Sequence, residues 1–237
     1  MISRKDKWEK YARAVDTTSS SKRATFELAA QYAVDLLGEK RSGVLLDIGC
    51  GFGEIDVLLA QNTNFKIIGC DISKRCIDVA REKVKSYGFE ERIKIEEGDV
   101  FHLAYPDNYF DVVVSFGYAS AATYKGAQSE VARVLKSDGL LICDFANLLC
   151  IYKIMNVPLR WKRLINEEGK HYNTLTARGI EEYFGRYQLK FVSQRLFNSY
   201  PPVNFLSSEF LIFFDRTAGK VLAKALGRVR IMCFKKV

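Results

Sequence analysis

The fold is decided by residues 44–60, VLLDIGCGFGEIDVLLA. An apolar run typical of a buried strand leads through Asp47 into three alternating glycines, and a helix-like pattern follows. Glycine permits a sharp turn and lets the backbone approach a ligand closely, because no Cβ stands in the way. The segment therefore predicts a strand, a ligand-binding loop and a helix.

The spacing within this loop argues against a nicotinamide dinucleotide as the ligand. Gly49, Gly51 and Gly53 are spaced Gly-x-Gly-x-Gly, whereas the dinucleotide fingerprint places its third glycine one position later. Glu54 stands at that position, where its carboxylate would repel a pyrophosphate at the helix N-terminus. The carboxylate of Asp47 also suits a positively charged ligand, such as one with a sulfonium and an ammonium group.

Outward from this stretch, strand-like and helix-like segments alternate. Strands are expected at 44–48, 65–70, 92–97, 109–115, 140–145, 187–197 and 229–236, and helices at 3–13, 24–37, 54–62, 74–87, 125–136 and 177–185. This order predicts an α/β fold with a mostly parallel sheet and helices on both faces. The turn Ser137-Asp138-Gly139 is expected to end a helix before a strand.

The length of the chain fits a single domain, residues 1–237, with inserted segments. We divide it into N-terminal helices at 1–38, a ligand-binding core at 39–146 and two cap insertions at 147–176 and 198–228. Both insertions interrupt the strand and helix alternation and interleave aromatic with basic residues. They are therefore the expected place for a substrate pocket.

Positive charge is concentrated in the C-terminal third. Residues 1–150 hold 20 Lys and Arg against 22 Asp and Glu, whereas residues 151–237 hold 16 against 6. Residues 216–230 are typical of a basic amphipathic helix, which either lies on an anionic membrane surface or covers the sheet. Such a bias attracts phosphates, nucleic acid or an anionic membrane, or it is simply a solvated surface.

Cysteine spacing and apolar runs indicate the compartment. The six cysteines are irregularly spaced without a Cys-x-x-Cys pair, which is typical of reduced core residues and not of disulfides or a zinc site. No apolar run is suited to a signal peptide or long enough for a transmembrane helix. We therefore expect a cytoplasmic protein without a metal site.

Acidic residues end three successive expected strands: Asp47, Asp71 and Asp99. The carboxyl ends of parallel strands line one edge of a sheet, so these carboxylates are expected to face one crevice. Asp71 follows Gly49 by 22 residues and stands where a carboxylate can accept hydrogen bonds from both hydroxyls of a ribose.

With these motifs in this order, residues 40–145 resemble the class I S-adenosylmethionine-dependent methyltransferases. DIGCGFGE is similar to their motif I, GCDIS to the acidic motif II, GDVFHLAYPDNYFDVVVS to motifs III and IV, and VARVLKSDGLLICDF to the helix and strand that follow. The resemblance implies a Rossmann-like, doubly wound sheet of seven strands, the last of them antiparallel. It also implies S-adenosylmethionine as the methyl donor.

The resemblance further implies roles for single residues. The three glycines would pack along the methionine part of the donor, Asp71 would bind the ribose, and Asp99 with the Val100 amide would read the adenine. Phe116 and its neighbours would border the methyl group. Tyr11 either covers the donor or packs an N-terminal helix. The expected donor-binding set is Tyr11, Asp47, Gly49, Gly51, Gly53, Asp71, Ile72, Asp99, Val100, Ser115 and Phe116.

Departures from related families narrow the acceptor. Phe116-Gly117-Tyr118 stands where amino-methylating DNA enzymes carry an Asn-Pro-Pro-Tyr tetrapeptide. No cysteine precedes a proline at a nucleophile position, which argues against methylation of pyrimidine carbon 5. We expect a small-molecule acceptor that could be anionic or lipid-like. The alternatives are a transfer RNA or ribosomal RNA methyltransferase and a non-catalytic cofactor-binding subunit.

The chain has two histidines, and they carry different expectations. His102 is expected to be a surface or packing residue. His171, inside the first cap, is the candidate general base. A base matters only for an acceptor with a high pKa, because holding the acceptor in line with an activated methyl donor can supply much of the acceleration.

Overall fold

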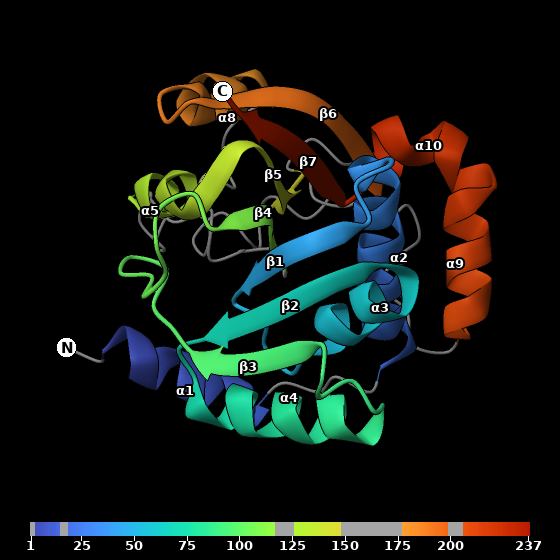
Figure 1. Cartoon of the computed structure of the whole chain (residues 1–237). Coiled ribbons are helices and arrows are strands. Elements are labelled where there is room, and N and C mark those ends of the chain that lie inside the picture. Colours follow the sequence, from blue (N-terminus) through green and yellow to red (C-terminus); the bar gives the residue numbers. More distant parts are fainter. Residues whose placement is uncertain (1–2, 15–18, 117–125, 148–176, 199–205) are drawn as a thin grey trace.

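One seven-stranded sheet organises the chain in the computed structural model (Figure 1), which describes residues 3–14, 19–116, 126–147, 177–198 and 206–237. The strands are β1 (Ser42–Ile48), β2 (Asn64–Asp71), β3 (Ile93–Glu97), β4 (Phe110–Ser115), β5 (Leu135–Ala146), β6 (Leu189–Phe197) and β7 (Val229–Lys236). Their spatial order is β3-β2-β1-β4-β5-β7-β6, and β7 runs antiparallel to both of its neighbours, β5 and β6, whereas the other adjacent pairs are parallel. The predicted α/β fold with an antiparallel last strand is confirmed.

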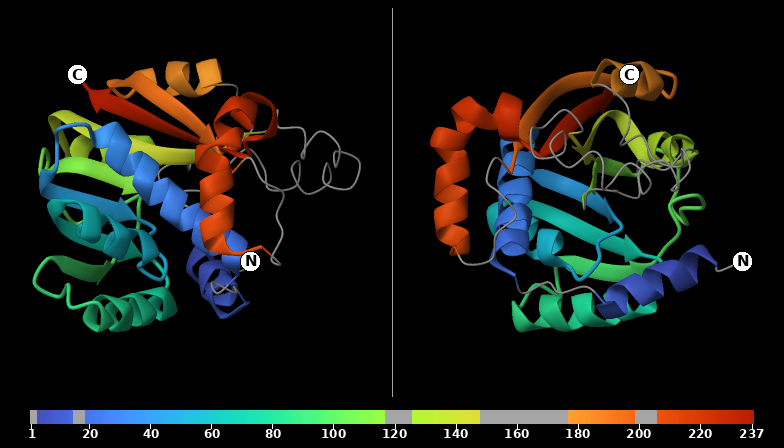
Figure 2. Two further views of the ribbon diagram at one scale, coloured as in Figure 1. Left: turned by 90° about the vertical axis from the view of Figure 1, so that its right-hand side faces the viewer. Right: turned by 180° about the vertical axis from the view of Figure 1, so that it is seen from behind.

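Helices cover both faces of this sheet (Figures 1 and 2). They are α1 (Arg4–Ala14), α2 (Ser20–Leu37), α3 (Glu54–Asn62), α4 (Lys74–Ser86), α5 (Ala127–Val134), α8 (Ala177–Gly185), α9 (Ser208–Arg216) and α10 (Ala218–Leu226). Leu45 packs with residues of α2 and α3 on one face, and Leu46 packs with residues of α5 and α8 on the other. Burial on both faces explains why β1 is apolar throughout and does not alternate with polar residues.

The turn expected at Ser137-Asp138-Gly139 lies inside a strand, not between a helix and a strand. Helix α5 ends at Val134, and β5 begins at the fully buried Leu135, which pairs with Phe110 of β4. The register then shifts, so that Leu140 is the next β5 residue aligned with β4. Asp138 takes a left-handed φ of 62° within this irregularity. Because Leu135 is buried and paired, β5 begins before the turn signal and not after it.

The basic segment 216–230, expected to hold a helix that ends near Gly227, contains α10, which runs from Ala218 to Leu226 with Gly227 as its C-cap. Helix α9 ends at Arg216 and α10 begins at Ala218, because Thr217 has non-helical angles of φ −106° and ψ −95°. Strand β7 starts at Val229. Leu211 of α9 is fully buried in the cluster that includes α2 residues. Within the described part of the second insertion, α9 therefore covers α2.

Several expectations fall outside the described residues: almost all of the first insertion with His171, the residue Gly117, and residues 199–205. The five cysteines that are described are buried and form no disulfide. Among the described residues, no helix has both the length and the apolar character needed to cross a membrane.

Candidate functional site

The glycine loop after β1 is held in left-handed backbone conformations. Gly49, Gly51 and Gly53 have φ angles of 76°, 55° and 77°, which side chains rarely tolerate. At Gly53 an added Cβ would lie 3.1 Å from the Cβ of Ala80, so this glycine lets the loop pack tightly on α4. At Gly51 an added Cβ would meet no atom within 4 Å. The loop therefore borders open space that a ligand can fill.

Asp71, at the end of β2, fastens this loop. Its Oδ2 accepts a hydrogen bond from the Gly51 amide at 3.0 Å, and its Oδ1 accepts one from the Ser73 amide at 2.8 Å. Burial raises the pKa of the Asp71 carboxyl, while these backbone donors act in the opposite direction. Each carboxylate oxygen has two lone pairs, so both oxygens keep an acceptor position for ligand hydroxyls.

Two buried carboxyls, Asp47 and Asp56, lie behind the loop. Asp47 is 2% exposed and its Oδ1 has no hydrogen-bond partner; Asp56 is fully buried, and neither of its oxygens has one. Burial, followed by the charges of Asp56 and Asp71, raises the pKa of Asp47 well above its usual range. Burial is also the main cause that raises the pKa of Asp56 to about 7. Unpaired buried carboxyls at a loop that faces open space are typical of a ligand site.

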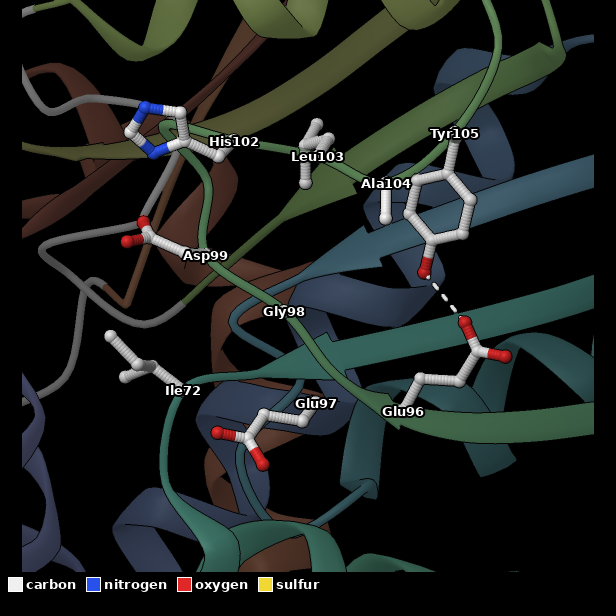
Figure 3. Close-up of a pocket in the computed structure, with 9 residues that line it drawn as sticks. All are labelled: Ile72, Glu96, Glu97, Gly98, Asp99, His102, Leu103, Ala104 and Tyr105. Carbon is white, nitrogen blue, oxygen red and sulfur yellow. Dashed lines mark hydrogen bonds between the residues drawn. The ribbon is translucent and has the colours of Figure 1, made fainter.

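A pocket of about 250 Å³ lies beside the loop at the carboxyl end of β3 (Figure 3). Figure 3 shows Ile72, Asp99 and His102 at one end of it, and Glu96 with Tyr105 at the other. Its lining residues are Ile72, Glu96, Glu97, Gly98, Asp99, His102, Leu103, Ala104 and Tyr105. Three of them are acidic, and each forms an ion pair with a basic residue: Glu96 with Lys94, Glu97 with Lys5, and Asp99 with Arg4.

Hydrogen bonds fix the walls of this pocket. Asp99 Oδ1 accepts from the Phe101 amide at 3.0 Å, and the Tyr105 hydroxyl donates to Glu96 Oε2 at 2.9 Å. Burial is the main cause that raises the pKa of Tyr105, which keeps its hydroxyl proton for this bond. His102, expected at the surface or in packing, is exposed and lines the pocket.

Helix α1 reaches across the same edge of the sheet. Arg4 forms an ion pair with Asp99, and its guanidinium lies 4.4 Å from the centroid of the Phe101 ring. Glu9 accepts a hydrogen bond from the Lys74 amide at the start of α4, at 2.6 Å. These contacts hold α1 against the acidic pocket.

Tyr11 lies on α1 and is 54% exposed, with its ring edge-on to Trp8 at 5.4 Å. Partial burial, with a smaller contribution from Cys76 of α4, raises the pKa of the Tyr11 hydroxyl. Its ring is thus half-open to solvent beside the contact between α1 and α4.

The remaining expected residues lie at the ends of β3 and β4. The Ser115 hydroxyl is buried and donates to the Ile48 carbonyl at 2.6 Å, which ties β4 to the start of the loop. Phe116 and Val100 are also buried. Asp47, the three glycines and Asp71 therefore form one loop structure, and Ile72 and Asp99 line the pocket next to it.

The comparisons with known proteins agree with this geometry. The family described as "Methyltransferase domain" matches residues 45–139, which contain the loop, Asp71 and the acidic pocket. Residues 45–139 of this chain are therefore similar to a methyltransferase domain. The resemblance inferred from the motifs is confirmed.

Individual relatives extend the likeness to this superfamily. Demethylmenaquinone methyltransferase of Bacillus licheniformis is 32% identical over 154 residues, which are 60% of this chain and 65% of that protein. The Staphylococcus aureus enzyme of the same name is 32% identical over 152 residues, 62% of this chain and 60% of its own length. The chain thus spans less than two thirds of these curated relatives.

Solved structures support the methyltransferase fold over nearly the whole chain. The structure of geranyl diphosphate methyltransferase in complex with S-adenosylmethionine superposes with a TM-score of 0.62 at 14% identity, covering 96% of this chain and 95% of that one. At this identity the match concerns the fold alone.

Sequence reasoning missed two features of the candidate site. Asp56 was not singled out, although an aspartate between Ile55 and Val57 in an apolar helix is a recognisable signal. The ion pair of Arg4 with Asp99 had no signal, because 95 residues separate its partners. Among the described residues, no group of His, Cys, Asp and Glu could hold a metal ion.

Proposed function

We propose that the protein transfers the methyl group of S-adenosylmethionine to a small-molecule acceptor in the cytoplasm. The observation that carries this proposal is the glycine loop itself. It is fastened to Asp71, it faces open space at Gly51, and Asp47 lies behind it with a buried Oδ1 that has no hydrogen-bond partner. The membership of residues 45–139 in a methyltransferase family supports the same reaction.

The residues present fit this donor group by group. Asp71 has acceptor positions for the ribose hydroxyls, and Ile72 offers an apolar contact to the adenine beside Asp99. The raised pKa of Asp47 falls when positive charge approaches, so this carboxyl favours the sulfonium and ammonium groups. S-adenosylmethionine, when bound, supplies a methyl group activated by the sulfonium. A pyrophosphate-bearing cofactor would instead meet the acidic residues of the pocket.

The contribution of this chain to the reaction is positioning. The loop glycines hold the donor side, and Ser115 and Phe116 at the end of β4 border the place where an acceptor must approach. Holding the reacting atoms in line and excluding water lower the barrier without a proton-transfer group. His171 stays the candidate base for an acceptor that must lose a proton.

The relatives favour a quinone-class acceptor over nucleic acid. Two of them are named for demethylmenaquinone, which is a small molecule, and the acceptor of this chain would then be lipid-like. Peripheral contact with a membrane belongs to this proposal, because a lipid-like acceptor has to be collected from one.

Two experiments test the proposal. Calorimetry should detect binding of S-adenosylmethionine and of S-adenosylhomocysteine, and tighter binding of a nicotinamide dinucleotide would contradict the donor assignment. Labelled S-adenosylmethionine is then incubated with the protein and a cell extract that is fractionated into lipid, small-molecule, RNA and protein pools. Label in the lipid or small-molecule pool supports the proposal. Label in RNA, with binding that weakens steeply as salt rises, would assign an RNA methyltransferase instead.

A further test concerns the base. Turnover of the His171→Ala variant should fall and recover partly at high pH if the histidine accepts a proton from the acceptor. Full turnover in this variant would exclude His171 as the base, and the proposed mechanism would then rest on positioning of the donor and the acceptor. Donor affinity, measured in parallel, should not change.

A further inference from the structure

A second pocket, of about 430 Å³, lies between α2, β6, α9 and α10. It is lined by Tyr32, Asp35, Arg41, Arg195, Arg216 and Lys220. None of these residues lines the acidic pocket of Figure 3. Figure 1 shows α9 and α10 on the side of the molecule away from α1, so the two pockets lie in different parts of the structure.

The positive charges of this pocket are poorly neutralised. Arg41 Nη1 is buried and has no hydrogen-bond partner. Arg216 donates to the neutral Gln31 side chain at 2.9 Å, which is its one side-chain hydrogen bond to the described residues. Within the described part of the chain, the Lys220 ammonium makes no ion pair or hydrogen bond.

The single carboxylate on the lining is a weak partner for these cations. Asp35 lies 3.9 Å from the Arg195 guanidinium, beyond hydrogen-bond distance. Asp215, buried behind the pocket, accepts from the Tyr32 hydroxyl at 3.3 Å. Burial, with a smaller contribution from the Asp215 charge, raises the pKa of Tyr32 to about 12, so this hydroxyl stays a neutral donor.

This arrangement is unfavourable without a ligand. A buried donor without a partner destabilises the fold, and four cations that line one pocket repel one another. Guanidinium groups present donors in a planar fork that matches phosphate oxygens, and an ammonium adds a compact charge. The volume is in the range of small-molecule sites, about 300–1,000 Å³, so it exceeds what a simple ion needs.

We propose that Arg41, Arg195, Arg216 and Lys220 form a binding site for a phosphate ester, separate from the methyl-donor site. The ligand is either a soluble phosphorylated metabolite or the phosphate of a lipid headgroup, since both present the same group to these cations. The site does not depend on the proposed methyl transfer, because its residues come from other elements.

The probe is inorganic pyrophosphate, titrated calorimetrically into the full chain at low salt. We expect Lys220→Gln to weaken pyrophosphate binding about tenfold, which is the scale of one charge-assisted hydrogen bond. Lys220 is exposed, so this variant keeps the fold. Arg178→Gln removes an equal charge from an exposed position of α8, and its affinity should stay at the wild-type value.

The direction in which Asp35→Asn changes pyrophosphate affinity distinguishes the proposal from a structural role of Asp35. Removal of a negative charge from the lining should strengthen pyrophosphate binding by a few fold, whereas a merely structural role for Asp35 predicts a loss. The proposal is overturned if pyrophosphate does not bind, if Lys220→Gln matches Arg178→Gln, or if Asp35→Asn weakens binding.

The source of the phosphate is then found with two further probes. Glycerol 3-phosphate represents a soluble ester, and phosphatidylcholine vesicles that contain phosphatidic acid represent a lipid headgroup. Binding of the soluble ester alone supports a metabolite. Vesicle retention that pyrophosphate displaces and that Lys220→Gln reduces supports a lipid. Retention of vesicles that is unchanged in Lys220→Gln would contradict the proposal for lipids.

Discussion

The molecule carries two pockets of opposite charge. The pocket beside the glycine loop is lined by Glu96, Glu97 and Asp99, whereas the pocket between α2 and α10 is lined by three arginines and Lys220. In each region a buried polar atom lacks a partner: a carboxylate oxygen of Asp47 near the first pocket, and a guanidinium nitrogen of Arg41 in the second. The difference shows that one fold can carry two pockets whose linings have opposite charge.

Among the predictions that test the acidic region against the basic one, we expect the largest effect for Asp56, through which folding stability should depend on pH. In the folded protein Asp56 keeps its proton up to about pH 7, but an unfolded aspartate loses it near pH 4. The folded state therefore binds more protons in this window, and stability falls as pH rises through it. We expect Asp56 to lower the free energy of unfolding by about 2–3 kcal/mol between pH 5 and pH 8.

Urea unfolding at both pH values, with and without Asp56→Asn, measures this effect. The asparagine variant should show a smaller loss of stability from pH 5 to pH 8 than the wild type. Asp78→Asn, on the exposed side of α4, is the matched control and should follow the wild type. An unchanged pH dependence in Asp56→Asn would mean that Asp56 is ionised throughout.

The second largest effect is expected for Asp71→Ala, which should weaken donor binding in the acidic region. The variant loses the proposed acceptor for the ribose hydroxyls and the anchor of the Gly51 amide, so affinity for S-adenosylmethionine should fall about ten- to a hundredfold. Calorimetry measures it, with Asp78→Ala as the control. Wild-type affinity in Asp71→Ala would remove this residue from the donor site.

A smaller effect is proton release on donor binding. A cationic ligand near Asp47 and Asp56 lowers their raised pKa values, so binding near pH 7 should release a fraction of a proton. Calorimetric heats in phosphate and in Tris buffer then differ, because the two buffers take up protons with different enthalpies. The difference should shrink in Asp56→Asn, and equal heats for the wild type would exclude the effect.

Arg4→Ala should produce the smallest change. The ion pair of Arg4 with Asp99 is partly exposed, and such pairs contribute about 0–1 kcal/mol. Removal of Arg4 leaves Asp99 open to the donor, so affinity should rise by no more than about threefold. Lys10→Ala, exposed on the same helix, should leave affinity unchanged. A tenfold loss in Arg4→Ala would instead make Arg4 part of the donor site.

The predictable part of the site is local in sequence. The spacing of Gly49, Gly51 and Gly53 predicts a loop with left-handed backbone angles, which the structure shows. Asp71 ends the adjacent parallel strand. Strand and helix alternation likewise predicted the sheet and both of its covered faces. The boundaries of the elements were less predictable. Strand β5 begins at the buried Leu135, before a clear turn signal.

By itself the sequence determined the methyltransferase fold, the glycine loop and the acidic strand ends, because each depends on residues close along the chain or on the order of the strands. Only the tertiary structure decided that Arg4 pairs with Asp99 and that Asp56 lies buried without a partner. The tertiary structure also forms the basic pocket, which Arg41 and Lys220 both line although 179 residues separate them. No local sequence pattern predicts this proximity, because it depends on how α9 and α10 fold back beside α2.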